Sequence, residues 1–116
     1  MIGTVLLLAA AGCGDRAPLT LEQAERLVLT APNIEASARE RGARPSFDWI
    51  RSGDSGWQFD VNSHTPCDHA RACSTLLGHY IVNKYSGAVV DLDAGEDGRE
   101  VSSPEMLALK RSFIEK

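Results

Sequence analysis

Segment 57–62 alternates large apolar and polar side chains, and this alternation limits the possible folds of the chain more than any other feature. Trp57, Phe59 and Val61 would lie on one face of an extended strand, and the polar residues between them would lie on the other. A strand that is buried on one side only is typical of antiparallel sheets. The sequence therefore predicts an antiparallel sheet with an apolar face turned to a core.

Polar turns near this segment predict a meander of four strands. The expected strands are one around Phe47 and Trp49, followed by 57–62, 78–84 and 88–92. The short turns are 52–56 and 85–87, and both contain glycine. Segments 64–75 and 91–100 are expected to be polar loops beside the sheet.

The two tryptophans are expected to pack in the core. Phe47 and Trp49 alternate onto one side of the first strand, and Trp57 opens the apolar side of the second. An exposed tryptophan would instead be a natural anchor for a binding partner.

Helices are expected before and after the sheet. Thr20 and Gln23 have the spacing of a capping box, and apolar residues then recur at helical spacing up to Ala31. Pro32 and Asn33 interrupt this helix, a more polar one is predicted over 34–41, and Gly42 would end it. The residues that indicate the closing helix are Ser103 as its cap, Pro104 at its first position, and Met106, Leu109 and Phe113 along one side.

These elements together predict an α+β fold. The expected architecture is an antiparallel four-stranded sheet, a meander, with N-terminal helices and a C-terminal helix packed on one face. The length of 116 residues leaves room for one modest core and no second domain.

The first residues indicate export. Residues 1–12 are mostly apolar, yet too few to cross about 30 Å of hydrocarbon as a helix, which is typical of a signal-peptide core. Ala10, Ala11, Gly12 and Cys13 resemble the lipobox of bacterial lipoproteins, in which small residues precede a cysteine that becomes the acylated N-terminus. The alternative is a buried N-terminal strand or helix that ends in cysteine.

The lipobox resemblance implies three segments and a location. Residues 1–12 would be a removable signal peptide, 13–18 a lipid-anchored tether and 19–116 a single α+β domain. Cys13 would carry the lipid, and Gly14 after it implies sorting to the outer membrane. We therefore expect a periplasmic protein whose first partner is the membrane itself, through the lipid anchor.

Export determines how the remaining cysteines are interpreted. Cys67 and Cys73 would be oxidised to a disulfide in the periplasm, and closing this short loop would contribute roughly 2.4 kcal/mol. The alternative is a metal or redox site made by His64, Cys67, His69 and Cys73, whose ligand types suit zinc or copper.

Composition and motifs argue against several other functions. The net charge of −4 argues against nucleic acid as a partner, because binding phosphates needs a surface of clustered lysine and arginine. Ser63 beside His64 has no nucleophile elbow, and the carboxylates of Asp91 and Asp93 are explained by a solvated acidic loop. Segment 93–98 partly resembles a calcium loop, but proline stands where the bidentate glutamate belongs. We therefore expect no enzyme activity, no cofactor and no nucleic acid partner.

A second resemblance points to a protein partner. The stretch 56–109, with the residues Tyr80 to Asp91 and then Ser103, Pro104 and Glu105, resembles the terminal unit of PepSY-like and cystatin-like exported domains, including NTF2-like immunity proteins. The resemblance implies an immunity or inhibitor protein that binds an antibacterial effector or a cell-wall hydrolase. The expected contact residues come from the two polar loops: His64, Asp68, His69, Arg71, Asp91, Asp93, Glu96 and Asp97. The alternatives are a metal-handling or redox lipoprotein and a PepSY-like regulator of the envelope.

Overall fold

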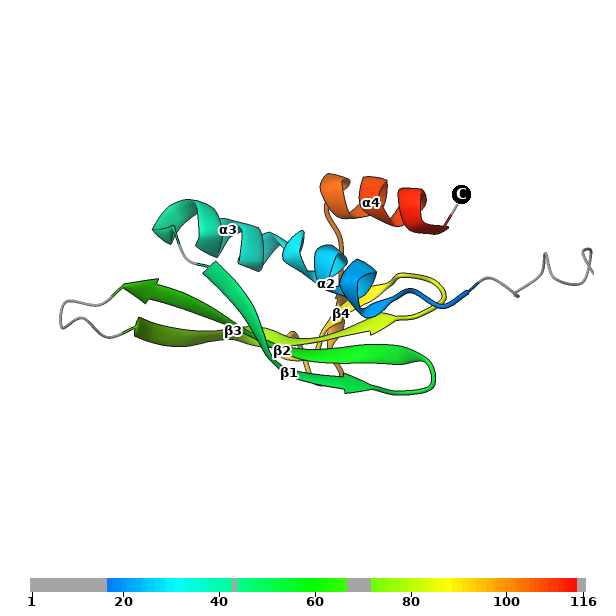
Figure 1. Ribbon diagram of the computed structural model, residues 1–116, viewed down its shortest axis with the longest axis horizontal. Helices are drawn as coiled ribbons and strands as arrows, with labels where there is room; N and C mark the ends of the chain where they lie inside the picture. The colour runs from blue at the N-terminus through cyan, green and yellow to red at the C-terminus, as the bar shows by residue number, and fades with distance from the viewer. Residues whose placement is uncertain (1–16, 43, 67–71, 115–116) are drawn as a thin grey trace, which may run out of the picture.

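The computed structural model describes residues 17–42, 44–66 and 72–114. Its elements in chain order are α2 (Leu21–Leu29), α3 (Pro32–Arg41), β1 (Arg44–Ser52), β2 (Gly56–Pro66), β3 (Ala72–Asn83), β4 (Val89–Asp91), β5 (Arg99–Val101) and α4 (Pro104–Ile114). The strands form one antiparallel sheet in the order β1-β2-β3-β4-β5, and Figure 1 shows α2, α3 and α4 on one side of it. The prediction of an α+β fold with an antiparallel meander is confirmed.

The sheet has five strands, so the prediction of four is wrong. The additional strand, β5, lies at the end of the segment that was expected to be the loop 91–100. Its three residues pair with β4, and Val101 lies opposite the buried Val89. A strand of three residues is too short to show a period of two, so its pairing depends on the neighbouring strand rather than on its own pattern.

The hairpin of β2 and β3 is also longer than predicted. The two strands stay paired until Pro66 lies opposite Ala72, with one shift of register between Val61 and Asn62, so they include most of the segment expected to be the loop 64–75. Backbone hydrogen bonds of an antiparallel pair continue whether or not the side chains are apolar, which explains why polar residues here still form strands. Figure 1 shows this end of the hairpin at the opposite end of the domain from the start of the described chain.

The N-terminal helices begin and end through local capping. Thr20 and Gln23 form the predicted capping box: Gln23 N donates to Thr20 Oγ1 at 3.2 Å, and Thr20 N donates to Gln23 Oε1 at 2.9 Å. Helix α3 begins at Pro32, two residues earlier than expected, because proline is well suited to the first turn of a helix. Gly42 ends it in the left-handed region, as predicted.

The helices and one face of the sheet enclose a single core. Its fully buried side chains come from both layers and include Leu27, Val28, Ile34, Phe59, Val61, Tyr80, Val82, Val89 and Met106. Helix α4 is attached at its start by Ser103, whose Oγ accepts from Met106 N at 3.0 Å and donates to Thr30 O at 3.1 Å. This cap confirms the predicted start of the closing helix and ties it to the end of α2.

The described chain begins at the turn between β3 and β4. Leu19 is buried, and its N–H donates to Lys84 O at 2.8 Å. Trp57 packs against the core beside it, as predicted, and its Nε1–H donates to Leu19 O at 2.9 Å. Among the described residues, no helix has the length and apolar character that crossing a membrane would require.

Candidate functional site on the open sheet face

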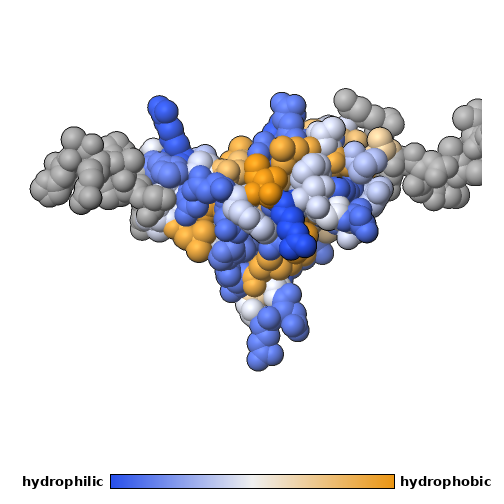
Figure 2. All heavy atoms as spheres, turned by 60° about the horizontal axis from the view of Figure 1, so that its bottom comes forward, coloured by the Kyte–Doolittle hydropathy of each residue, from blue (hydrophilic) through white to orange (hydrophobic). Residues whose placement is uncertain are grey.

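The helices leave one face of the sheet uncovered within the described part of the chain, and we call it the open face. It comprises Asp48, Trp49 and Arg51 of β1, Gln58, Asp60, Asn62 and His64 of β2, Leu76, His79 and Ile81 of β3, and Val90 of β4. Figure 2 turns the underside of Figure 1 forward and shows hydrophobic atoms near the middle of the molecule, with hydrophilic side chains around them. The open face therefore combines an apolar centre with polar surroundings.

A β-bulge turns Trp49 from the core side to the open face. The register of β1 against β2 shifts after Phe47, which pairs with Val61, so that Trp49 pairs with Asp60. Phe47 packs against the core, whereas Trp49 is 44% exposed. The prediction that Trp49 packs in the core is therefore wrong, because the extra residue of the bulge, Asp48, inverts the alternation of the strand.

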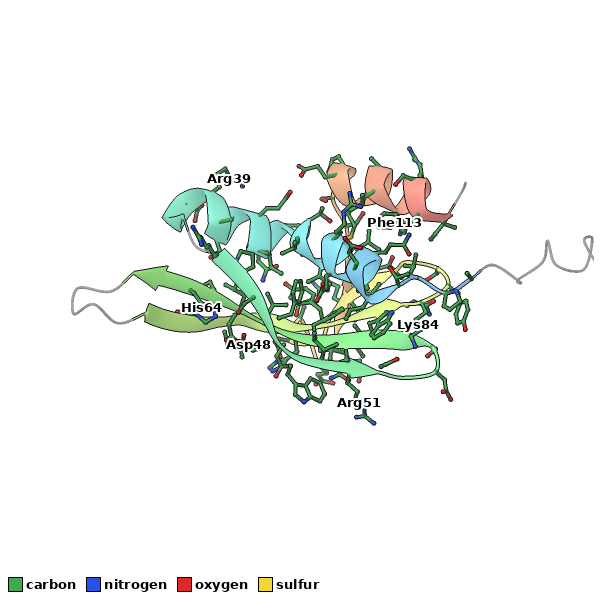
Figure 3. The ribbon with its side chains drawn as sticks, viewed as in Figure 1. Arg39, Asp48, Arg51, His64, Lys84 and Phe113 are labelled. Atoms are coloured by element: carbon green, nitrogen blue, oxygen red, sulfur yellow. The ribbon has the colours of Figure 1, made fainter. Side chains whose placement is uncertain are left out.

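The carboxylate of Asp48 is held in place by its neighbours. Asn62 Nδ2 donates to Asp48 Oδ2 at 2.5 Å, and Ser46 Oγ donates to Asp48 Oδ1 at 2.8 Å. His64 Nε2 lies 2.6 Å from Ser46 Oγ and 3.8 Å from Asp48 Oδ2. Because the serine gives its one proton to Asp48, its oxygen accepts from His64 Nε2. Figure 3 labels Asp48 and His64 in this cluster.

Ser46, His64 and Asp48 have the residue types of a nucleophilic triad but not its geometry. In such a triad the carboxylate binds the imidazole nitrogen opposite the one that contacts the serine, and so orients the base. Here Asp48 binds the serine itself and lies on the same side of the imidazole as the serine. The cluster positions a carboxylate; it does not activate the hydroxyl.

A second histidine joins the turn after β4 to the open face. His79 Nδ1 lies 2.9 Å from Asp93 Oδ2, His79 N donates to the same oxygen at 3.0 Å, and His79 Nε2 lies 3.6 Å from Asp60 Oδ1. The hydrogen bond to Asp93, together with the charges of Asp93, Asp60 and Asp91, raises the pKa of His79 against the opposing effect of desolvation. The hydrogen bond to His79 likewise lowers the pKa of Asp93.

We expect an NMR titration to show the pKa of His79 above its usual value of about 6.5. Because the pKa of His79 is raised in the folded protein, its charged hydrogen bond to Asp93 stabilises the fold fully below about pH 6.5. This contribution is lost as the pH rises through the folded-state pKa of His79. At the acid end it is lost as the pH falls through the lowered pKa of Asp93. Asp93→Asn should bring the pKa of His79 down more than Asp60→Asn, since Asp93 makes the direct hydrogen bond. Equal effects of the two substitutions would contradict this assignment.

The structure places some of the predicted contact residues at the open face. His64 lies on it, and Asp93 is attached to it through His79. Asp91 is in β4, and its Oδ1 accepts from Asp93 N at 2.9 Å. Its carboxylate therefore stabilises the turn after β4. Glu96 and Asp97 are exposed in the following turn.

The remaining predicted sites stay predictions. Cys13, Cys67, Asp68, His69 and Arg71 lie outside the described residues. Cys73 belongs to β3, and its disulfide with Cys67 is untested. Among the described residues, no group of three or more histidine, cysteine, aspartate or glutamate side chains is placed to hold a metal ion.

Sequence reasoning missed most of the open face. Asp60 and Asn62 were visible as the polar side of the alternating segment, and that side could have been recognised as a surface. No pattern in the sequence marks Asp48, Trp49 or His79 as part of a surface. The first two depend on the bulge, and His79 is defined by a carboxylate fourteen residues further along the chain.

The fold and the site define a class of protein: a small α+β domain whose helices cover one side of an antiparallel sheet and leave the other side free. No protein-family model matches the sequence, and no curated protein matches it. A solved structure described as a type VI secretion system effector–immunity complex from Pseudomonas protegens contains a similar chain. The two superpose with a TM-score of 0.56 at 18% sequence identity, over 81% of this chain and 73% of that chain. This similarity shows a shared fold.

Proposed function

We propose that this protein is an immunity protein, which binds an antibacterial effector or a cell-wall hydrolase and blocks its activity. The observation that carries the proposal is the open face with Trp49 exposed near its bulge, because exposed aromatic side chains commonly anchor protein partners. The fold shared with a chain of an effector–immunity complex supports a toxic protein as the partner.

The small volume of the hollow on the open face favours a protein over a small molecule as the binding partner. This hollow is lined by Arg51, Gln58 and Ile81 with the turn that joins β1 to β2, and measures about 200 Å³. Small-molecule sites usually enclose about 300 to 1,000 Å³. A hollow of this size can hold a side chain of a protein partner but is small for a whole small-molecule ligand.

We also propose that the protein acts by occlusion, without catalysis and without a cofactor. The imidazoles of His64 and His79 are both engaged by hydrogen bonds to neighbouring side chains. The hydroxyl of Ser46 gives its proton to Asp48, and no carboxylate among the described residues orients His64 from its Nδ1 side, as nucleophilic catalysis requires. These arrangements suit a preformed recognition surface.

The protein is proposed to work in the periplasm as a lipoprotein anchored to the outer membrane through Cys13. The lipobox residues support the anchor. With the lipid on Cys13, the tether would reach the domain at one end, and the far end of the β2–β3 hairpin would point away from that end (Figure 1).

The proposal is tested by co-expression. A toxic protein encoded beside this gene is directed to the periplasm, with and without the full-length chain, and surviving colonies are counted. We expect the chain to restore growth by several orders of magnitude, and mass spectrometry of the membrane fraction to find the lipid on Cys13. A Cys13→Ser variant should lose the lipid and separate anchoring from protection. A harmless neighbouring protein, or toxicity that the chain does not reduce, would overturn the proposal.

A further inference from the structure

We propose that the partner presents an arginine or lysine side chain to the open face, where it packs on Trp49 and pairs with Asp48 and Asp60. This inference rests on the proposed function for the existence of a protein partner. It adds the surface that is used and the chemistry that the partner must carry.

Trp49 lies between two carboxylates. Asp48 precedes it in the bulge, and Asp60 is its partner across β1 and β2. The residue is 44% exposed, so a large part of its surface can contact a ligand. An aromatic face attracts a cation, and nearby carboxylates add charge-assisted hydrogen bonds to the same group. A guanidinium or an ammonium group satisfies both.

The two carboxylates are available to such a cation. Among the described residues, each ion pair joins a histidine to an aspartate, and a histidine neutralises its partner only when it is protonated. His79 lies closer to Asp93, at 2.9 Å, than to Asp60, at 3.6 Å. Asp60 therefore has no direct hydrogen bond from His79, and its carboxylate can still accept one from a partner.

Asp48 is positioned before any partner arrives. Its two oxygens accept from Ser46 and Asn62, which fixes the plane of the carboxylate in the free protein. A group that is already ordered loses little conformational entropy on binding. Binding then benefits from the ion pair without the usual cost of ordering a surface side chain.

The charges around this position select where the cation lies. Arg51 follows Trp49 by two residues on the same face, and Figure 3 shows it pointing away from the helices. A cationic partner group would be repelled at that end and attracted at the Asp48 end. The net charge of −4 adds a long-range attraction for a basic partner, which increases the rate of encounter.

A peptide experiment tests the surface independently of any toxin. Fluorescein-labelled hexa-arginine is titrated with the full-length protein, and binding is followed by fluorescence anisotropy, with hexa-glutamate as the charge-reversed probe. We expect Trp49→Ala and Asp60→Asn each to weaken binding about tenfold, the effect of losing one charged or cation–π contact. The matched control is Tyr85→Ala, since Tyr85 is also 44% exposed but lies in the turn after β3. Raising the salt from about 0.05 M to about 0.5 M should weaken binding as well.

The same variants are then used in the co-expression assay, after circular dichroism has shown that each is folded. Loss of protection with Trp49→Ala and Asp60→Asn, and not with Tyr85→Ala, supports the inference. Wild-type protection that survives both open-face substitutions would overturn it while leaving the immunity function intact. If the wild-type chain gives no protection, the proposed function fails, and the peptide titration alone decides: hexa-arginine binding that neither substitution weakens overturns the inference.

Discussion

Trp57→Ala is expected to lower the free energy of unfolding by about 3 kcal/mol, whereas Trp49→Ala should change it by less than about 1 kcal/mol. The two residues are chemically identical and lie on neighbouring strands, but only one supports the core. Trp57 packs against the buried cluster, donates Nε1–H to Leu19 O, and has Lys84 Nζ 4.7 Å from its ring centroid. Trp49 projects from the other face and is 44% exposed.

The measurement is urea denaturation of both variants, followed by far-ultraviolet circular dichroism. Trp57→Phe serves as an intermediate, because it keeps an aromatic ring against the core but loses part of the packing and the hydrogen bond to Leu19, the latter at a cost of about 1 kcal/mol. Equal losses for Trp49→Ala and Trp57→Ala would mean that the bulge in β1 does not place the two side chains on opposite faces.

Alkaline pH should destabilise the protein through Tyr80. Its side chain is fully buried, and its hydroxyl donates to Asn33 Oδ1 at the start of α3. Burial, followed by the charge of Asp91, raises the pKa of Tyr80 to about 12. Because the pKa of Tyr80 is raised in the folded protein, the contribution of its protonated phenol to the stability of the fold is complete below about pH 10. This contribution is lost as the pH rises through the folded-state pKa of about 12. A difference of about two pKa units corresponds to about 3 kcal/mol.

The test compares the wild type with Tyr80→Phe, because other groups also titrate in this range. Between pH 10 and pH 12 the wild type should lose about 2 kcal/mol more stability than the variant, and spectrophotometric titration should show one tyrosine fewer with a high pKa. Tyr85→Phe, in which the exposed tyrosine is changed, should follow the wild-type pH profile. If Tyr80→Phe and the wild type lose stability in parallel, the phenol is not buried as described.

Local patterns in the sequence predicted the elements that such patterns control. The capping box of Thr20 and Gln23, the stop at Gly42 and the cap at Ser103 are interactions between residues close in the chain, and all three are present. The alternation of segment 57–62 correctly predicted a strand with one buried face.

The polarity of a segment did not predict whether it forms a loop or a strand. Loops 64–75 and 91–100 were chosen because they are polar and lie between apolar segments. Most of the first and the end of the second are strands, since backbone pairing with a neighbour extends a strand through polar residues. Apart from His64, which belongs to the first of these segments, the open face is formed mainly by side chains that the sequence assigned to strands or to the core.

The sequence by itself determined the fold class, the capped helices and which side of β2 is buried, because each of these follows from propensities and periodicities within about ten residues. The tertiary structure decided the fifth strand, the outward turn of Trp49 and the meeting of His79 with Asp60 and Asp93. A bulge is a property of two paired strands, and a cluster across strands is a property of their register. Neither exists until distant segments are in contact.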